Sequence, residues 1–266
     1  MKKKTFLRIM MILLASGFLL CAGVVAFVQH GYKANARLYK NASTSYTSQN
    51  TQGSSGSVSG GQGDDGEKVI APIKVDFEAL QKANPEVIGW LYCPDTTIDF
   101  PICRAEDNDY YIDHNYEREY SPYGAIFADC MNRPGFEDSN YLIYGHHLTD
   151  GSMFAILDKW LKQDFFDEHP IMWILTPEQD YRVELFSAYY IEAIDEAYTI
   201  FQGPSQQFDR YLQVAKNNSK VTADVELDGN AKYVMFSTCA YVFYMARSVV
   251  HGKMVPVDSA GGVLIP

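Results

Sequence analysis

The sequence predicts a mainly β fold, a closed barrel or a sandwich built from seven or eight short strands. Short apolar runs with turn residues between them follow one another from residue 97 to residue 251. Aromatic residues make up 14% of the 266 residues, and they are enriched in strands. Val183 and Leu185 alternate with Arg182 and Glu184, which is typical of a half-buried strand.

An apolar run precedes this domain. Residues 9–28 contain no charged side chain. As a helix the run is about 30 Å long, which matches the hydrocarbon core of a bilayer. It is longer than a typical signal-peptide core of about 7–15 residues, and no small-residue cleavage site clearly ends it. We therefore expect an uncleaved transmembrane anchor, with a cleaved signal peptide as the alternative.

The charges around this run predict its orientation. Four basic residues lie within positions 2–8, and Lys33 and Arg37 follow the run. The basic excess at the N-terminus predicts that residues 1–8 are a cytoplasmic tail and that the rest of the chain is extracellular. Beyond residue 28 the chain holds 18 basic and 33 acidic residues, a net charge of −15. This balance excludes a basic nucleic-acid-binding surface.

A linker is expected between the anchor and the domain. Residues 41–66 are rich in Ser, Thr, Gly, Gln and Asn and hold almost no large apolar side chain. Such a composition buries too little surface to fold and is typical of a flexible tether. We therefore assign 29–69 to a flexible linker and 70–266 to the folded domain.

Helices are expected at three places. Asp76 can cap a helix that ends at Ala83, before Asn84-Pro85. Ser152 and Ser205 can each cap a segment that carries its apolar residues on one stripe, as in packing against a core. The helix after Ser205 lies in a long connection, and long connections often carry function. The strands are expected at Thr97–Ile102, Gly124–Ala128, Tyr141–Tyr144, Ile171–Leu175, Tyr181–Tyr190, Lys232–Thr238 and Arg247–His251.

Two residues near the C-terminus could act together. Cys239 ends an apolar strand, and Arg247 opens the next strand eight residues later. If the two strands pair as a hairpin, Arg247 lies beside Cys239. A nearby guanidinium favours the thiolate, the reactive form of cysteine, and can donate to an oxyanion or a substrate carbonyl.

A histidine could complete the site. His146 follows the strand 141–144, and Gly145 permits a sharp exit from that strand. At a barrel mouth His146 is well placed to give or take a proton. His146 and His147 could instead bind a metal, but no cysteine or acid stands at ligand spacing, so we expect no metal and no cofactor.

The cysteines do not suggest a disulfide framework. There are five, an odd and widely spaced set. Free buried thiols are the expectation, with a Cys93–Cys103 bridge as the alternative.

Several motifs between residues 84 and 253 occur together in order. They are NPEVIGWLY at 84–92, TTIDFPI at 96–102, YYIDHNYERE at 110–119, GAIFAD at 124–129, YLIYGHHLTDGSMF at 141–154 and STC at 237–239, followed by Arg247. On these motifs the chain resembles class B sortases. The resemblance implies a closed eight-stranded sortase-type β-barrel, with N-terminal helices and a helix in the long connection before the catalytic strand.

The resemblance also implies the activity and its residues. The catalytic set falls on His146, Cys239 and Arg247. The substrate-binding set falls on Ile112, Tyr198, Ser237 and Thr238. The enzyme would cleave an Asn-Pro-x-Thr-like sorting motif in secreted proteins through a thioester and transfer the acyl group to an amine of a cell-wall peptide or its lipid-linked precursor. No nucleic-acid partner is expected.

The chain departs from the pattern of the family near the cysteine. Phe236 stands where leucine is common, and the acidic residue that often follows the catalytic cysteine is missing, since Ala240-Tyr241-Val242 stand there. The interval from Cys239 to Arg247 is also shorter than in some members. Three alternatives stay open: a pilin-polymerising sortase, a cysteine hydrolase that uses water as acceptor, and a non-catalytic binding barrel.

Overall fold

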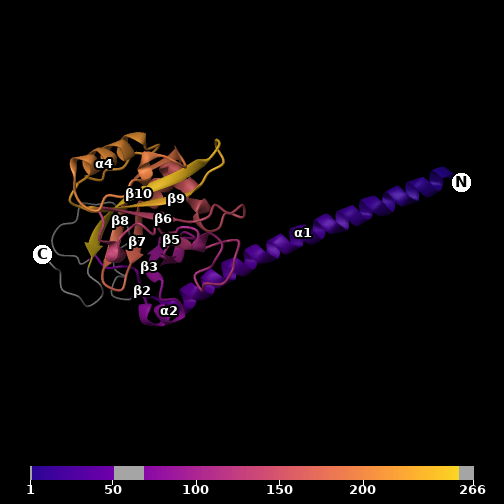
Figure 1. The fold of residues 1–266 in the computed structure, drawn as a ribbon, viewed down its shortest axis with the longest axis horizontal. Coiled ribbons are helices and arrows are strands. Elements are labelled where there is room, and N and C mark those ends of the chain that lie inside the picture. The colour runs from indigo at the N-terminus through magenta and orange to yellow at the C-terminus, as the bar shows by residue number, and fades with distance from the viewer. Residues whose placement is uncertain (1, 51–68, 258–266) are drawn as a thin grey trace. The chain divides into compact units, whose positions relative to one another are not determined.

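The computed structural model describes residues 2–50 and 69–257. The chain divides after Asn41 into two compact units. Most of helix α1 (Lys2–Tyr46) forms the first unit, and a closed barrel of eight strands forms most of the second. The prediction of a closed eight-stranded barrel is therefore confirmed (Figure 1).

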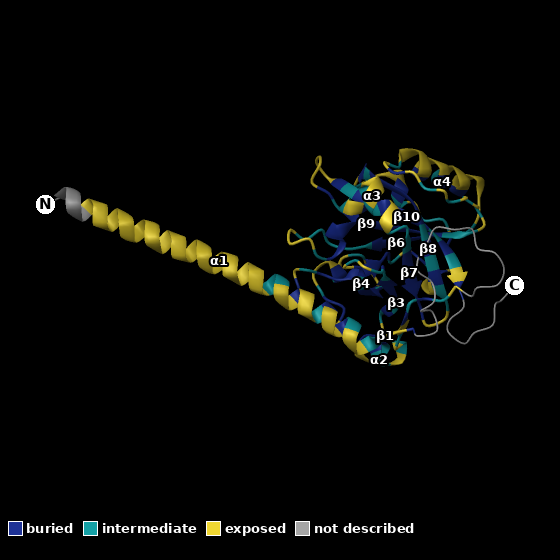
Figure 2. Ribbon diagram, turned by 180° about the vertical axis from the view of Figure 1, so that it is seen from behind, coloured by how far each residue is buried: buried dark blue, intermediate teal, exposed yellow. Residues whose placement is uncertain are grey.

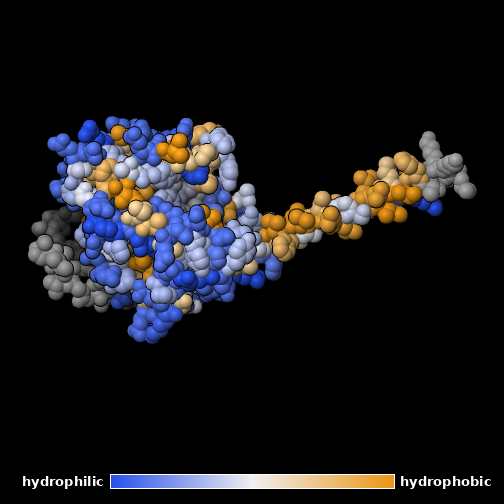
Figure 3. All heavy atoms as spheres, in the orientation of Figure 1, coloured by the Kyte–Doolittle hydropathy of each residue, from blue (hydrophilic) through white to orange (hydrophobic). Residues whose placement is uncertain are grey.

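Helix α1 contains the apolar run expected as an anchor. The part from Phe6 onward is long and apolar enough to cross a membrane, and none of its most apolar 18-residue window is buried. Apolar side chains cover this part of the helix (Figure 3). The helix is therefore compatible with a membrane anchor, and a signal sequence near the N-terminus can meet the same criteria of length and hydropathy.

Regular structure extends into the segment expected to be a linker. Helix α1 continues to Tyr46, and β1 (Thr47–Gln49) pairs antiparallel with β2 (Ile73–Val75). The side chain of Asn50 is buried and donates to the carbonyl of Ala71 at 3.0 Å. These backbone and amide hydrogen bonds provide order without a large apolar surface, so composition alone was a poor guide to residues 29–50. Residues 51–68 of the expected linker lie outside the described part of the chain.

Helix α2 (Phe77–Ala83) follows β2 as predicted. The carboxylate of Asp76 accepts a hydrogen bond from the amide of Ala79 at 2.9 Å, which satisfies one unpaired donor of the first turn. The helix ends at Asn84, before Pro85.

The barrel has one continuous order of neighbouring strands. They are β3 (Val87–Tyr92), β4 (Asp99–Cys103), β5 (Ile126–Ala128), β6 (Asn140–Tyr144), β7 (Ile171–Leu175), β8 (Asp180–Glu192), β9 (Lys232–Cys239) and β10 (Ala246–Val257). The order around the barrel is β10-β8-β7-β3-β4-β5-β6-β9, and the β4–β5 and β6–β9 pairs are parallel. All seven predicted strands are present, and β3, whose apolar run does not alternate with polar residues, is the eighth.

Helices cover parts of the barrel. In α4 (Gln206–Asn218) the hydroxyl of Ser205 caps the first turn, as predicted, and Phe208, Leu212 and Ala215 pack on the barrel. The outward face of α4 is exposed (Figure 2). The short α3 (Gln163–Glu168) and the 3-10 segments Tyr110–Ile112, Pro134–Phe136, Phe154–Leu161 and Glu196–Tyr198 complete the regular structure that is described.

The segment after Ser152 differs from the prediction. It is a 3-10 helix, here called η3 (Phe154–Leu161), and Ser152 does not cap it. The hydroxyl of Ser152 donates instead to the carboxylate of Asp150 at 2.6 Å. Met153 intervenes with a φ of 54°, so the chain turns sharply between the serine and the helix.

All five cysteines are free, so the Cys93–Cys103 bridge is not formed. Both of these thiols are buried, and burial raises the pKa of Cys93 to about 12 and that of Cys103 further. Neutral thiols in apolar surroundings are poor nucleophiles.

Candidate active site

Strands β6, β9 and β10 are neighbours and bring the three predicted catalytic residues to one end of the sheet. In the antiparallel β9–β10 hairpin Cys239 lies directly opposite Arg247, as predicted. In the parallel β6–β9 pair Tyr144 lies opposite Ser237, and the amide of Gly145 donates to the carbonyl of Ser237 at 3.2 Å. His146 follows the end of β6 by two residues and Cys239 is the last residue of β9, so both lie at the same end of the sheet.

Cys239 and Arg247 share one face of the sheet, and His146 follows the end of the neighbouring strand β6. Residues opposite each other in a ladder share a face, and so do residues two apart in a strand. His146 is two residues after Tyr144, Cys239 is two after Ser237, and Arg247 is opposite Cys239. All three are half-buried, so they are supported by the fold yet open to a ligand.

His146 is held by the backbone of the 3-10 segment before β5. Its Nε2 lies 2.6 Å from the carbonyl oxygen of Ile112. Because a carbonyl only accepts, Nε2 carries a proton in this arrangement. Nδ1 is then the ring nitrogen that is left to exchange a proton with a ligand.

Gly124 lies against the ring of His146. A Cβ at this position would be 2.8 Å from Cδ2 of His146 and 2.7 Å from the carbonyl oxygen of Ile112. Its φ of +59° is also in the left-handed region that favours glycine. Gly124 was not predicted as a site residue, although it opens one of the motifs quoted above.

Arg247 has no carboxylate partner at its guanidinium among residues 2–50 and 69–257. Its Nη1 donates to the carbonyl of Ala246 at 3.1 Å and more weakly to that of Met245. A guanidinium has five N–H donors, so most of them stay available to a ligand.

Tyr198 and Ser237 lie beside the catalytic set. The hydroxyl of Tyr198 and the hydroxyl of Ser237 are 2.8 Å apart. Burial raises the pKa of Tyr198, the bond to Ser237 and the charge of Arg247 lower it, and Cys239 raises it. Tyr198 is therefore close enough to Cys239 and Arg247 to interact with their charges.

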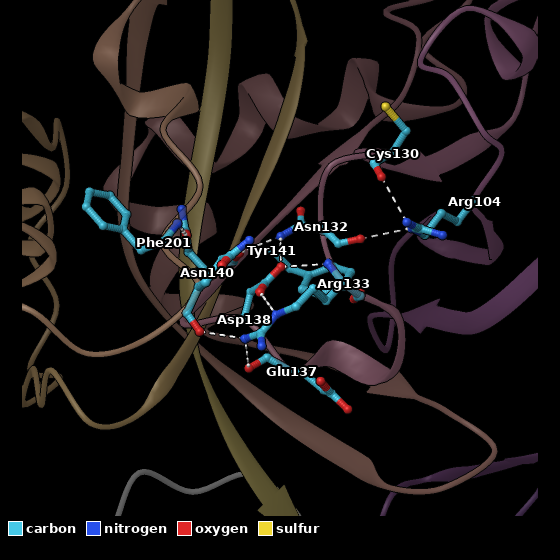
Figure 4. A network of polar contacts seen from close by, with 10 residues as sticks. Arg104, Cys130, Asn132, Arg133, Glu137, Asp138, Asn140, Tyr141 and Phe201 are labelled. Carbon is cyan, nitrogen blue, oxygen red and sulfur yellow. Dashed lines mark hydrogen bonds and ion pairs between the residues drawn. The ribbon is translucent and has the colours of Figure 1, made fainter.

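A polar network holds the segment that carries Tyr198 (Figure 4). The buried side chain of Asn140 donates to the carbonyl of Thr199 at 2.8 Å and accepts from the amide of Phe201 at 2.7 Å. Arg133 donates to the carbonyl of Gln202 at 2.5 Å. The segment 199–202 is thus fixed to β6 and to the loop before it.

An acid completes this network. Asp138 is fully buried as a side chain and pairs with Arg133 at 2.6 Å. Burial raises the pKa of Asp138, but hydrogen bonds from Asn132 and Arg133 outweigh burial and lower the pKa below its ordinary value. The buried carboxylate of Asp138 therefore keeps its negative charge because the guanidinium of Arg133 pairs with it.

The other two expected substrate-binding residues differ in their surroundings. Ile112 is 43% exposed, and its carbonyl holds His146. Thr238 is buried, and its hydroxyl donates to the carbonyl of Gly145 at 2.7 Å. By the alternation of β9, the side chain of Thr238 faces away from Cys239. Substrate contact by these residues stays a prediction.

The two adjacent histidines have different surroundings. His147 is one residue beyond His146, and its Nε2 donates to the carboxylate of Asp158 at 2.9 Å. The ring of His146 lies instead at the carbonyl of Ile112. In the described residues there is no group of three or more His, Cys, Asp or Glu side chains placed to hold a metal ion.

The loop that joins β9 to β10 is apolar and exposed. Residues 241–245 read Tyr-Val-Phe-Tyr-Met, and each side chain is at least 46% exposed. The loop follows Cys239 directly, so it forms one border of the site.

Comparisons with known proteins identify relatives. Sortase B of Listeria monocytogenes is 39% identical over 190 residues, which are 70% of this chain and 77% of that protein. The structure of a Bacillus anthracis protein described as similar to sortase B matches with a TM-score of 0.69 and 31% identity, over 85% of this chain and 98% of that chain. A Staphylococcus aureus sortase B–substrate complex matches with a TM-score of 0.65 and 29% identity, over 68% and 85%. A scan against models of protein families found no match.

Proposed function

Because this chain belongs to the sortase B family of cysteine transpeptidases, we propose that Cys239 is its nucleophile, His146 its acid and base, and Arg247 its oxyanion-stabilising residue. One observation supports this assignment: Cys239 and Arg247 are opposite in the β9–β10 ladder, and β6, which runs parallel to β9, ends at the same end of the sheet just before His146. A thiol, an imidazole and a guanidinium in that arrangement suit acyl transfer.

The first half of the reaction forms a thioester. The thiolate of Cys239 attacks the backbone carbonyl carbon of the threonine in an Asn-Pro-x-Thr-like sorting motif. Arg247 donates to the oxyanion that forms. The C–N bond then breaks, and the leaving amine takes its proton from Nδ1 of His146, since Nε2 is held by the carbonyl of Ile112.

The second half of the reaction transfers the acyl group. An amine attacks the thioester carbonyl carbon while His146 takes its proton. The C–S bond breaks, and the thiolate of Cys239 is restored. We propose that the amine belongs to a cell-wall peptide or to its lipid-linked precursor.

The substrate peptide would lie across the end of the sheet that carries these three residues. The paired hydroxyls of Tyr198 and Ser237 can meet a polar group of the motif, and the exposed side chain of Ile112 can meet an apolar one. The related Staphylococcus aureus enzyme has been solved as a substrate complex, which supports a peptide ligand for this fold. Thr238 would contribute through its backbone, because its hydroxyl is already bonded.

We also propose the placement of the chain in the cell. Residues 1–8 are a cytoplasmic tail, 9–28 cross the membrane once, and the catalytic domain lies outside, where secreted proteins emerge. The long apolar helix and the basic residues before it support this orientation. Anchoring at the membrane raises the effective concentration of substrates that appear there.

The test uses the purified full chain in detergent micelles and a peptide with an Asn-Pro-x-Thr motif. Mass spectrometry should find an acyl adduct on the wild-type chain and none on Cys239→Ala. An adduct that persists in Cys239→Ala would overturn the nucleophile assignment. His146→Ala should abolish turnover and His147→Ala should retain a measurable part of it, while the reverse result would mean that His147 is the catalytic histidine.

The acceptor needs a separate measurement. The acyl-enzyme is offered an amine from a wall peptide, a lysine side chain of a pilin-like peptide, or water alone. Faster transfer to the wall peptide supports the proposal. Preference for the lysine would indicate a pilin-polymerising sortase, and release of free acid despite excess amine would indicate a hydrolase.

A further inference from the structure

A carboxylate behind the site joins two of its catalytic segments. Asp158, on η3, accepts a hydrogen bond at Oδ2 from Nε2 of His147 and one at Oδ1 from the hydroxyl of Ser248. Each oxygen of the carboxylate therefore has one donor, and the two donors come from different parts of the chain.

These two donors are the neighbours of two catalytic residues. His147 directly follows His146, and Ser248 directly follows Arg247. Successive residues of a strand point to opposite faces, so Ser248 and the carboxylate that it binds lie on the face of β10 away from Arg247, and His147 binds the same carboxylate. Since β9 lies between β6 and β10, Asp158 links the segments on both sides of the strand that ends at Cys239.

The position of Asp158 is itself fixed by packing. Phe154 and Trp160 of η3 are fully buried, and the ring of Phe154 meets that of Phe236 in β9 edge to face at 6.1 Å between centroids. The amide of Phe154 also donates to the carbonyl of His146 at 2.9 Å. These contacts hold η3, and with it the carboxylate of Asp158, in a fixed position.

Loss of the carboxylate would leave polar atoms without partners. Ser248 is fully buried, and its hydroxyl would lose its acceptor, the carboxylate of Asp158. Nδ1 of His147 is buried and already unpaired among the described residues, so Nε2 is the ring's hydrogen-bonding atom. Both side chains would therefore turn to find new partners.

We propose that Asp158 is a positioning residue of the transpeptidase site, which fixes the directions of His146 and Arg247 through His147 and Ser248. The inference rests on the proposed function, because it needs His146 and Arg247 to be catalytic. Asp158 itself does not touch the substrate. By holding His147 and Ser248, it sets the orientation of the two side chains next to them in the chain, and through that orientation the geometry of the transition state.

The test compares Asp158→Ala and Asp158→Asn in the full chain, with kcat counted per active site by thiol titration. We expect kcat of Asp158→Ala to fall about 10- to 100-fold while KM for the peptide changes less than about two-fold. Asp158→Asn should recover part of the loss, because its amide oxygen still accepts one bond. Asp164→Asn, which removes one exposed carboxylate from α3, should keep wild-type kcat.

A double-variant cycle separates positioning from a general loss of stability. In the Ser248→Ala background, Asp158→Ala should cost clearly less in kcat than in the wild type, because one of the two links is already cut. If the fold-decreases in kcat of the two single variants simply multiply in the double variant, the inference is overturned. An unchanged kcat in Asp158→Ala would also overturn it. If Asp158→Ala does not fold, Ser248→Ala alone must lower kcat at constant KM for the inference to stand.

The two failures are distinguishable. If the wild-type chain forms no acyl adduct with sorting peptides, the proposed function fails. If the wild-type chain turns over normally and Asp158→Ala does too, only the positioning inference fails.

Discussion

Gly124→Ala should disable the site by displacing His146. The added Cβ would lie 2.7 Å from the carbonyl oxygens of Tyr111 and Ile112 and 2.8 Å from Cδ2 of His146. Ordinary contacts begin near about 3.4 Å, so the neighbours must move by roughly 0.6 Å. The same carbonyl of Ile112 holds Nε2 of His146, so the movement disturbs the orientation of the ring.

The magnitude has two parts. A misplacement of about 1 Å at a reacting group can cost about 100-fold in rate, so a shift of about half that should lower kcat by about 10-fold or more. The left-handed backbone at φ +59° adds about 1–2 kcal/mol of strain for a residue with a Cβ. The melting temperature should fall by several degrees.

A second glycine provides the matched control. Gly151 has a φ of +84°, and a Cβ there meets nothing within 4 Å. Gly151→Ala should therefore show the backbone strain as a lower melting temperature, with kcat unchanged. The assay is turnover of a quenched sorting peptide, counted per titrated thiol, together with thermal unfolding. If Gly124→Ala keeps kcat within two-fold of Gly151→Ala, the assignment of this contact to catalysis is refuted.

Three further predictions concern other parts of the domain. Burial lowers the pKa of His251 to about 3. Below about pH 6.5 the unfolded chain therefore binds a proton at this histidine that the folded chain does not bind. The free energy of unfolding should be constant in this respect above about pH 6.5 and should fall by about 2 kcal/mol by about pH 5. Urea unfolding should show this loss in the wild type and a smaller one in His251→Phe, and equal losses would contradict it. Tyr198→Phe removes the bond to Ser237 and should raise KM for the peptide more than it lowers kcat, whereas an unchanged KM would separate this pair from substrate binding. Ser205→Ala removes the cap of α4 and should cost about 1 kcal/mol in denaturant unfolding with no change in kcat, and an unchanged midpoint would mean that the cap is dispensable.

The parts that were predicted correctly depend on short stretches of sequence. The caps at Asp76 and Ser205 and the β9–β10 hairpin involve residues fewer than ten positions apart, so local signals were enough. The position of His146 at the same end of the sheet as Cys239 was only suggested by a strand end, because it depends on the parallel β6–β9 pairing.

The parts that were not predicted depend on distant contacts. Asp158 was one acid among many on a segment expected to be a helix, and its role is visible only once Ser248, 90 positions away, is beside it. Gly124 has no room for a Cβ because the backbone at Tyr111 and Ile112 and the ring of His146 lie close to it. Composition also misjudged residues 47–50, since their partners come from the chain around β2.

The parallel pairing of β6 with β9 also bears on when reactivity can arise. Gly145 and Thr238, which bond across this pair, are 93 positions apart in the chain. Contacts between such distant segments carry a large loop-closure cost and are intrinsically slow to form. Cys239 and His146 therefore reach the same end of the sheet only once the barrel closes. A chain that lacks the β9–β10 hairpin lacks both Cys239 and Arg247 at that end, so the proposed site is complete only in the fully folded domain.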